Sequence, residues 1–220
     1  MTPTPEDASL PTPEDAGRLT PQDAVRLEEC IAGGGVAVFP TDTLYGIGCD
    51  PDSPDAVERL YELKGRPPWQ PCAVMFFSLP AALRALPELT GRERQAASTL
   101  LPGPVALLLP NRRERFLRAC GTDGALGLRV PLLTPALAAL AVVEVPVMQS
   151  SANLSGGADA RRLAEVPPAL RENADLVLDG GELPGTASTV LDLRGYEERG
   201  EWRVVREGPV GRGEFEQALG

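Results

Sequence analysis

Short apolar segments alternate with amphipathic segments from residue 33 to the end of the chain, and no Gly-, Ser- or Pro-rich linker interrupts them. The apolar segments have the length of buried strands, and the amphipathic ones have helical spacing. This alternation predicts a mixed α/β sheet with helices packed on it, in a single domain. The predicted strands are 36–39, 72–77, 105–109, 126–130, 145–149, 176–178, 189–193 and 202–206. The predicted helices are 54–63, 80–86, 90–101, 135–141 and 167–173, with a last helix from 213.

The N-terminal segment contains three copies of a Thr-Pro-acidic or Gln-Asp-Ala unit, spaced every eight residues. Only the third copy leads into an amphipathic segment. There Thr20 is suited to be the N-cap, Pro21 the first helical residue and Asp23 the acid of the first turn. Residues 1–18 are therefore predicted to be a disordered acidic tail, with partner binding as an open alternative, and 19–220 to be the folded domain.

The composition excludes several classes of protein. The formal net charge of −10 is poorly suited to broad, salt-dependent binding of nucleic acid. Because the chain has no histidine, Ser-His-Asp and Cys-His catalysis are excluded. Without histidine and without a C-x-x-C pair, a zinc site of ordinary spacing is strongly disfavoured. The four cysteines are scattered, and no signal-like or membrane-length apolar segment occurs. These features predict a cytoplasmic protein with reduced thiols and no metal-ligating residues.

The only lysine, Lys64, stands in the segment KGRPP (64–68), whereas the other basic residues are all arginine. An ammonium group is a compact, strongly hydrated charge, and a guanidinium is a flat fork of donors. A site that has both side by side is suited to a polyanion such as a nucleoside triphosphate. Taken alone, Lys64 is equally well explained as a surface lysine left in an arginine-rich chain.

Two polar segments follow predicted strands directly. PTDTLYG (40–46) carries two hydroxyls and a carboxylate, and VMQSSANLSGG (147–157) is small, polar and ends in glycines. Ligands gather at strand ends in α/β folds, and glycines allow a backbone to approach a phosphate closely. Each segment also fits an ordinary turn that side-chain to backbone hydrogen bonds close. The second segment is not a Walker A loop, because G-x-x-x-x-G-K-[ST] does not occur in the chain.

Two arginines, Arg129 and Arg206, each lie at the end of a predicted strand. An arginine in such a place is often solvated or paired. With Lys64 and Arg66 they form an anion-binding site only if the fold brings all four side chains together. The hypothesis therefore requires the ammonium of Lys64 to lie beside the serine-rich segment 147–157.

Seven sequence blocks, in the same order along the chain, resemble the YrdC/Sua5 family of threonylcarbamoyl-AMP synthases. The blocks are PTDTLYG, KGRP followed by Pro71, PGP at 102–104, RVP, PVMQSSANLSG, ASTVLD and VVREG. Each block alone has little specificity, but the ordered set covers roughly residues 20–215. Because the chain ends soon after VVREG, it resembles the short, single-domain form of the family.

The resemblance implies a twisted mixed sheet with helices packed around a large concave basic cavity. It also implies a nucleotidyltransferase that makes threonylcarbamoyl-AMP and pyrophosphate from L-threonine, bicarbonate and ATP, with Mg²⁺ accompanying the ATP. The product then serves N6-threonylcarbamoyladenosine formation in tRNA, which separate downstream transferase proteins complete. Binding of tRNA itself is expected to be weak at most, and no membrane is involved.

Positions that match the family's motifs imply two groups of site residues. The candidate ATP-binding residues are Lys64, Arg66, Gln70, Ser151, Asn153 and Arg206. The candidate L-threonine-binding residues are Thr41, Thr43, Arg129, Gln149 and Ser188. Lys64 and Arg66 are also the candidate catalytic residues. Arg129 is the expected partner of the substrate carboxylate, because a guanidinium binds a carboxylate through two parallel hydrogen bonds.

The chain departs from the family's pattern at three positions. Met75 stands where the family often has a histidine, and Ala106 stands where the family's PGP-x-T block has its threonine. Ala125 stands where a threonine precedes the RVP block, although Thr122 is close. These departures leave the fine geometry of substrate binding open, but they do not affect the expected fold.

Two other functions fit parts of the pattern. A carbamoyl-adenylate module of hydrogenase maturation proteins would share the fold, but those proteins carry zinc-finger and acylphosphatase regions that this chain lacks. An RNA-binding or ribosome-assembly module would use the same cavity for RNA. The negative charge and the aromatic fraction of 5% disfavour that alternative. An RNA-binding protein would also lose affinity steeply as the salt concentration rises.

Overall fold

The computed structural model describes residues 17–220, so the predicted tail at 1–18 lies outside the described residues except for its last two. Leu19 is already buried, and its N–H donates to the carbonyl of Ala136 at 2.8 Å. The first helix, α1 (Pro21–Ala32), begins as predicted. Thr20 accepts a hydrogen bond from the N–H of Asp23 and donates its own N–H to that carboxylate, which makes a capping box with Pro21 at the first helical position.

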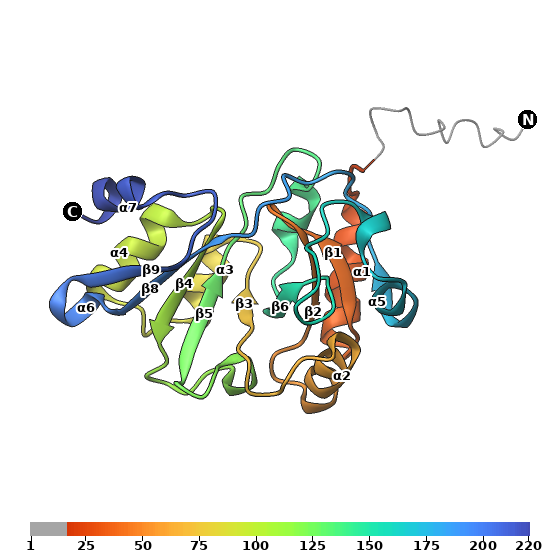
Figure 1. The fold of residues 1–220 in the computed structure, drawn as a ribbon, viewed down its shortest axis with the longest axis horizontal. Helices are drawn as coiled ribbons and strands as arrows, with labels where there is room; N and C mark the ends of the chain where they lie inside the picture. Colours follow the sequence, from red (N-terminus) through yellow and green to blue (C-terminus); the bar gives the residue numbers. More distant parts are fainter. Residues whose placement is uncertain (1–16) are drawn as a thin grey trace, which may run out of the picture.

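The described chain forms one nine-stranded mixed sheet in the order β7-β1-β2-β6-β3-β5-β4-β8-β9 (Figure 1). The strands are β1 (Ala37–Pro40), β2 (Tyr45–Cys49), β3 (Ala73–Met75), β4 (Val105–Pro110), β5 (Ala125–Arg129), β6 (Val147–Ser151), β7 (Leu176–Val177), β8 (Thr189–Gly195) and β9 (Glu201–Arg206). The pairs β1–β7, β3–β5 and β4–β8 are parallel, and the other neighbours are antiparallel. The predicted mixed α/β fold is confirmed.

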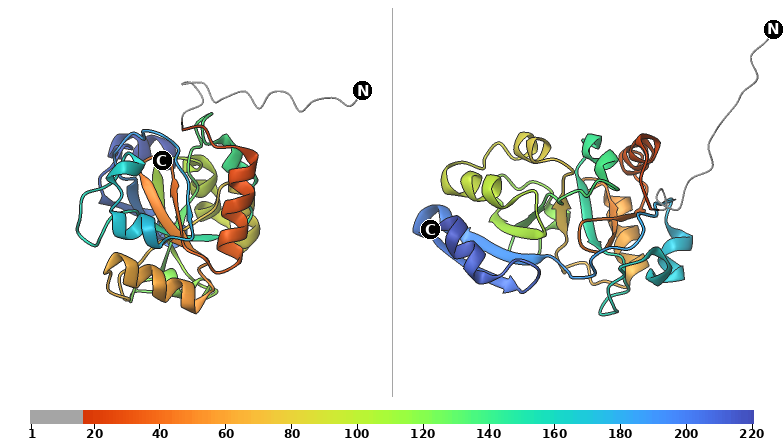
Figure 2. Two further views of the ribbon diagram at one scale, coloured as in Figure 1. Left: turned by 90° about the vertical axis from the view of Figure 1, so that its right-hand side faces the viewer. Right: turned by 90° about the horizontal axis from the view of Figure 1, so that it is seen from above.

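Helices cover the sheet and its ends. The remaining α-helices are α2 (Pro54–Lys64), α3 (Leu79–Ala85), α4 (Gly91–Leu100), α5 (Pro168–Asn173), α6 (Tyr196–Arg199) and α7 (Arg212–Leu219). Three short 3₁₀ helices are η1 (Leu117–Ala119), η2 (Ala138–Val142) and η3 (Leu163–Glu165). Seen from above, α1, α3 and α4 lie along the same side of the sheet (Figure 2). None of the helices within residues 17–220 combines the length and the apolar character needed to cross a membrane.

The predicted secondary structure differs from the structure in several details. The segment predicted as a helix at 135–141 is mostly a 3₁₀ turn, η2, shifted toward the C-terminus. Strand β2 was not predicted, because its glycines at 46 and 48 read as part of a loop. These glycines allow close packing inside the sheet: a Cβ at Gly46 would lie 2.8 Å from Nε2 of Gln149, and one at Gly48 would lie 2.6 Å from a methyl of Val147. Because β6 approaches β2 this closely, a larger residue at either position would displace it.

The end of helix α2 directs the predicted basic turn toward the centre of the sheet. Gly65 adopts a left-handed conformation with φ of 57°, and the N–H groups of Gly65 and Arg66 donate to carbonyls of the last helical turn. The helix therefore ends at Lys64, whose side chain lies on the buried face. The chain then reverses at Gly65, so that Arg66 approaches β6 from outside the helix.

Candidate functional site

Eight of the predicted site residues line one cavity of about 330 Å³. They come from the β1–β2 turn, the segment after α2 and the ends of β5, β6, β8 and β9, and they are Thr41, Thr43, Arg66, Arg129, Gln149, Ser151, Ser188 and Arg206. The charged lining residues are all arginines, namely Arg66, Arg129 and Arg206. The volume is at the low end of the range for small-molecule sites, so the large cavity implied by the resemblance is not what the structure shows.

Arg129 ends the central strand β5, with Met75 and Ala106 as its register partners on the two neighbouring strands. Only 4% of the residue is exposed. Its Nη2 donates to the carboxylate of Asp42 and, at 3.3 Å, to Oγ1 of Thr43, while its buried Nε has no partner among the described residues. Arg129 is thus fixed by the β1–β2 turn, lines the cavity and keeps one unused, buried donor.

The turn between β1 and β2 is held together by the hydroxyl of Thr41. This hydroxyl donates to the carbonyl of Leu44 at 2.8 Å and accepts from the N–H groups of Thr43 and Leu44, each at 3.3 Å. The Thr41 and Thr43 hydroxyls lie 3.2 Å apart. Both of the earlier interpretations of PTDTLYG therefore hold locally: side chains close the turn, and the two threonines line the cavity.

Asp42, in the same turn, was noted only as part of the motif and not as a site residue. Its carboxylate contacts Arg129 through one oxygen and accepts the N–H of Leu132 at 3.0 Å through the other. Only 5% of each side chain of this ion pair is exposed. Burial raises the pKa of Asp42, and the charge of Arg129 acts in the opposite direction. The sequence offered one signal for this pair: Asp42 lies between two candidate binding threonines directly after a buried strand, and a buried carboxylate needs a cationic partner.

Arg206 and Ser188 form the wall of the cavity on the β8–β9 side. Nη2 and Nε of Arg206 donate to the carbonyl of Ser188 at 2.7 and 3.1 Å. Burial lowers the pKa of Arg206. Among the described residues the side chain therefore has a neutral oxygen partner only, and it lines the same cavity as Thr41 and Thr43.

Arg66 forms the wall beside β6. Nη1 lies 3.4 Å from Oγ of Ser150, Nη2 donates to the carbonyl of Pro71, and Nε lies 3.5 Å from the carbonyl of Gln70. Ser150, which was not among the predicted residues, also lines the cavity. Gln70 itself is exposed and does not line the cavity, and its contribution is the backbone carbonyl.

Lys64 lies directly beneath the serine-rich loop, as the hypothesis requires, but it does not line the cavity. Its Nζ donates to the carbonyls of Ser151 and Asn153, the latter at 2.6 Å, and to Oδ1 of Asn153 at 3.3 Å. The residue is 1% exposed. Burial, with a smaller contribution from the charge of Arg66, lowers the pKa of Lys64 to about 8.

The side chain of Asn153 also forms its hydrogen bonds within the loop, and Asn153 does not line the cavity. Its Oδ1 accepts from the hydroxyl of Ser151 at 2.8 Å, and its Nδ2 donates to the carbonyl of Gly157 at 2.7 Å. Lys64, Ser151 and Asn153 therefore form one hydrogen-bonded unit. Ser151 is the member of this unit that reaches the cavity.

The three departures from the family's pattern fall in different places. Ala106 lines the cavity beside Arg129 on β4. Met75 is fully buried at the end of β3. Ala125 starts β5, opposite Pro110, and does not line the cavity. Ala106 is therefore the one departure of the three that changes the cavity wall.

The described residues offer no separate metal centre, because no three His, Cys, Asp or Glu side chains between 17 and 220 are grouped to hold an ion. Asp42, the carboxylate nearest to the cavity arginines in the turn, is already occupied by Arg129 and Leu132.

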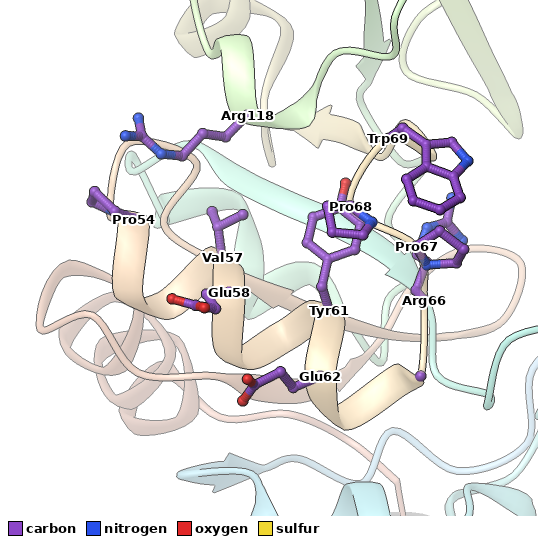
Figure 3. A pocket seen from close by; sticks show the side chains of 11 residues that line it. Pro54, Val57, Glu58, Tyr61, Glu62, Arg66, Pro67, Pro68, Trp69 and Arg118 are labelled. Atoms are coloured by element: carbon purple, nitrogen blue, oxygen red, sulfur yellow. The ribbon is translucent and has the colours of Figure 1, made fainter.

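A larger open groove of about 740 Å³ runs along the outer face of α2 (Figure 3). It is lined by apolar residues and two acids of α2, by the proline-rich segment after the helix and by Arg118. Arg66 lines both the groove and the cavity. The predicted site residues other than Arg66 do not line the groove, so its size does not make it the candidate site.

Comparison with known proteins identifies the family. The Sua5/YciO/YrdC family model, described as "Telomere recombination", matches residues 29–208. Threonylcarbamoyl-AMP synthase from Pyrococcus abyssi (strain GE5 / Orsay) is 30% identical over 190 residues, which are 85% of this chain and 54% of that protein. The enzyme of the same name from Xanthomonas campestris pv. campestris (strain B100) is 35% identical over 160 residues, which are 71% of this chain and 84% of that protein.

A solved structure gives the same relationship. P. abyssi Sua5 complexed with L-threonine matches with a TM-score of 0.78 and 28% sequence identity, over 92% of this chain and 59% of that chain. The chain spans little more than half the length of these P. abyssi proteins. With a family model that matches most of its length and a shared fold, the chain belongs to the Sua5/YciO/YrdC family.

Proposed function

We propose that this chain is a nucleotidyltransferase that makes threonylcarbamoyl-AMP from L-threonine, bicarbonate and ATP. The observation that supports this most directly is the single cavity lined by Arg66, Arg129 and Arg206 together with the Thr41 and Thr43 hydroxyls. Two anionic substrates need cations at separate points of one site. The relatives named threonylcarbamoyl-AMP synthase and the Sua5 complex with L-threonine support the same reaction.

Threonine would bind at the end of β5. Its carboxylate would accept from the unused Nε edge of Arg129, and its hydroxyl and amine would lie among Thr41, Thr43 and the side chain of Gln149. Each hydrogen bond to a charged group contributes about 1.5–3 kcal/mol. The amine reacts with bicarbonate to give a carbamate and water, and the carbamate oxygen then faces the nucleotide.

ATP would bind between Arg66, Arg206 and the Ser151 loop. The carbamate oxygen attacks the α-phosphorus, the bond from that phosphorus to the bridging oxygen breaks, and pyrophosphate leaves with its negative charge. Catalysis of this kind consists mainly of in-line alignment and neutralisation of charge, which suits a chain without histidine. Mg²⁺ carried by the phosphates would supply part of the charge neutralisation.

Lys64 would act on the nucleotide through the loop. All three N–H bonds of its ammonium already point to oxygens of Ser151 and Asn153. In this arrangement Lys64 holds the loop in the conformation that presents Ser151 to the cavity. Its positive charge would still lower the energy of phosphates a few ångströms away, because a buried charge is poorly screened.

The labile product would pass to separate threonylcarbamoyl-transferase proteins for formation of N6-threonylcarbamoyladenosine in tRNA. The chain itself would bind tRNA weakly at most, since its net charge is −10.

Mass spectrometry of a reaction with threonine, bicarbonate, ATP and Mg²⁺ tests the proposal. We expect the mass of threonylcarbamoyl-AMP, and release of pyrophosphate only when threonine and bicarbonate are both present. Pyrophosphate release that is independent of threonine would contradict the proposal. Tight, salt-sensitive binding of RNA without any adenylate product would instead support the RNA-binding alternative.

A further inference from the structure

Both predicted subsites of the cavity attract anions, so an arginine alone does not decide which anion binds where. A triphosphate carries several negative charges, whereas an amino acid presents one carboxylate beside an ammonium. An unpaired arginine at the threonine subsite would therefore attract phosphate more strongly than it attracts threonine. The protein needs a feature that reserves this subsite for the amino acid.

The three cavity arginines differ in one respect. Arg129 forms a buried ion pair with Asp42. Arg66 donates to carbonyl oxygens and a serine hydroxyl, and Arg206 donates to a carbonyl oxygen, and neither forms a salt bridge within residues 17–220. The net charge of the β5 end of the cavity is therefore near zero, whereas the Arg66 and Arg206 walls keep their positive charge.

The geometry of Asp42 places it behind Arg129 and not in the cavity. Its carboxylate is anchored on both sides, by Arg129 and by the N–H of Leu132 at 3.0 Å, and it is absent from the cavity lining. The contact occupies Nη2 of Arg129 and leaves the buried Nε free. Asp42 therefore both neutralises the guanidinium and fixes its orientation, with Nη2 turned toward the β1–β2 turn.

We propose that Asp42 is a positioning and specificity residue that excludes polyphosphate from the amino-acid subsite and directs the free edge of Arg129 to a carboxylate. This inference rests on the proposed function, because it names how that site tells its two anionic substrates apart. Asp42 makes no contact with substrate and acts through Arg129.

Binding of inorganic triphosphate, followed by calorimetry without turnover, tests the proposal in the full chain. In the wild-type protein we expect one triphosphate site, which ATP displaces and threonine does not. In Asp42→Asn, Arg129 becomes a free cation, and we expect a second triphosphate site that threonine displaces. The affinity of triphosphate at the amino-acid subsite should rise at least about tenfold, because a like-signed charge next to it has been removed.

Asp175→Asn is a control with the same kinds of partner at a more exposed ion pair. Asp175 has the same kinds of partner as Asp42, since its carboxylate accepts from an arginine, Arg59, and from a backbone N–H, that of Val36 at 2.8 Å. It does not line the cavity. We expect this variant to keep one triphosphate site. If a second site then appears in Asp42→Asn and not in Asp175→Asn, the loss of an ion pair in general does not explain it.

The proposal would be overturned if Asp42→Asn bound triphosphate at one site only and if ATP, but not threonine, still displaced it. If that variant does not fold, the wild-type protein still provides the decisive measurement, because a second triphosphate that threonine displaces contradicts exclusion by Asp42. These outcomes differ from failure of the proposed function, which would be seen as absence of threonine-dependent pyrophosphate release whatever the number of triphosphate sites.

Discussion

Arg129 and Lys64 are two buried cations that are held in different ways: Arg129 lines the cavity, whereas Lys64 lies beneath the Ser151–Asn153 loop. Arg129 is 4% exposed and Lys64 is 1% exposed. Arg129 is paired with a carboxylate, that of Asp42. Lys64 is surrounded by neutral oxygens of the Ser151–Asn153 loop. The two cations are therefore about equally buried, but an anion compensates the charge of one and neutral dipoles that of the other.

The first consequence concerns unused donors. An ammonium has three N–H bonds, and Lys64 directs all three to protein oxygens. A guanidinium has five, and Arg129 leaves at least its Nε without a partner among the described residues. Arg129 can therefore gain a ligand without losing a protein contact, whereas Lys64 must give up a loop contact first. In the proposed reaction Arg129 would therefore recognise substrate, and Lys64 would hold the loop beside it.

The second consequence concerns charge. Burial of a cation is unfavourable unless an anion or several dipoles compensate for the lost water. Asp42 provides the anion for Arg129. Lys64 has only dipoles in contact, and its pKa is lowered to about 8. Lys64 is thus the one of the two cations that can lose its charge in an ordinary buffer.

The largest effect should follow from Lys64→Ala. This change removes three charge-assisted hydrogen bonds, and the loss of only two at about 1.5–3 kcal/mol each corresponds to a decrease on the order of 10²–10⁴-fold. We expect kcat for threonine-dependent pyrophosphate release to fall by such a factor because the Ser151 loop loses its anchor. Hydrogen exchange of the loop amides should accelerate at the same time, which a purely direct contact with phosphate would not cause.

Arg59→Ala is the control on the same helix. Arg59 is about 42% exposed on α2 and pairs with Asp175 away from the cavity. Exposed ion pairs contribute about 0–1 kcal/mol, so we expect turnover within about fivefold of the wild-type value. Wild-type turnover in Lys64→Ala would contradict the role given to Lys64.

Much of this site was predictable from the sequence, because strand ends meet at one place in an α/β sheet. Arg129 and Arg206 end apolar strands, and the sheet order brings these ends to the same cavity. The cap of α1 was equally clear, since Thr20, Pro21 and Asp23 are local signals. Such features depend on neighbours in the chain or on a regular register.

The features that were missed depend on contacts between distant segments. The pairing of Asp42 with Arg129 joins positions 87 residues apart. The burial of Lys64 under its loop likewise depends on how α2 meets β6, and nothing in KGRPP indicates that all three donors are already used. Strand β2 was missed because glycines disfavour a strand, and only the sheet order reveals that they are needed for close packing against Gln149 and Val147.

A titration of ATP binding against pH tests the difference between Lys64 and Arg129. Its expected effect is smaller than that of Lys64→Ala. Burial lowers the pKa of Arg129 as well, but a guanidinium starts from a far higher value and stays protonated in ordinary buffers. As the pH rises above about 8, Lys64 is therefore the cation that loses its proton. We expect the affinity for ATP, measured by calorimetry, to fall by up to about tenfold per pH unit above 8. Binding is the better readout, because the amine of threonine also titrates and would raise turnover over the same range.

The stability of the protein should change in the opposite direction. The pKa of Lys64 is lower in the folded protein than in the unfolded chain. Between about pH 8 and the ordinary lysine value, the unfolded chain therefore binds more protons, and this group's contribution to the free energy of unfolding rises with pH. Loss of ATP affinity together with a falling melting temperature would point to unfolding. An affinity that stays constant to pH 10 would contradict the assignment to Lys64.

The smallest expected effect tests the unused donor of Arg129. Ala106 lines the cavity and is the register partner of Arg129 on β4, so a side chain at 106 lies beside the guanidinium. In Ala106→Thr the new hydroxyl can accept from the buried Nε, and we expect the free energy of unfolding to rise by about 0.5–1.5 kcal/mol. The same contact competes with the substrate carboxylate, so KM for threonine should rise a few-fold, by about the same energy. Ala106→Val adds the same shape without the hydroxyl. If the two variants have equal stability and equal KM, Nε of Arg129 is not the donor that threonine uses.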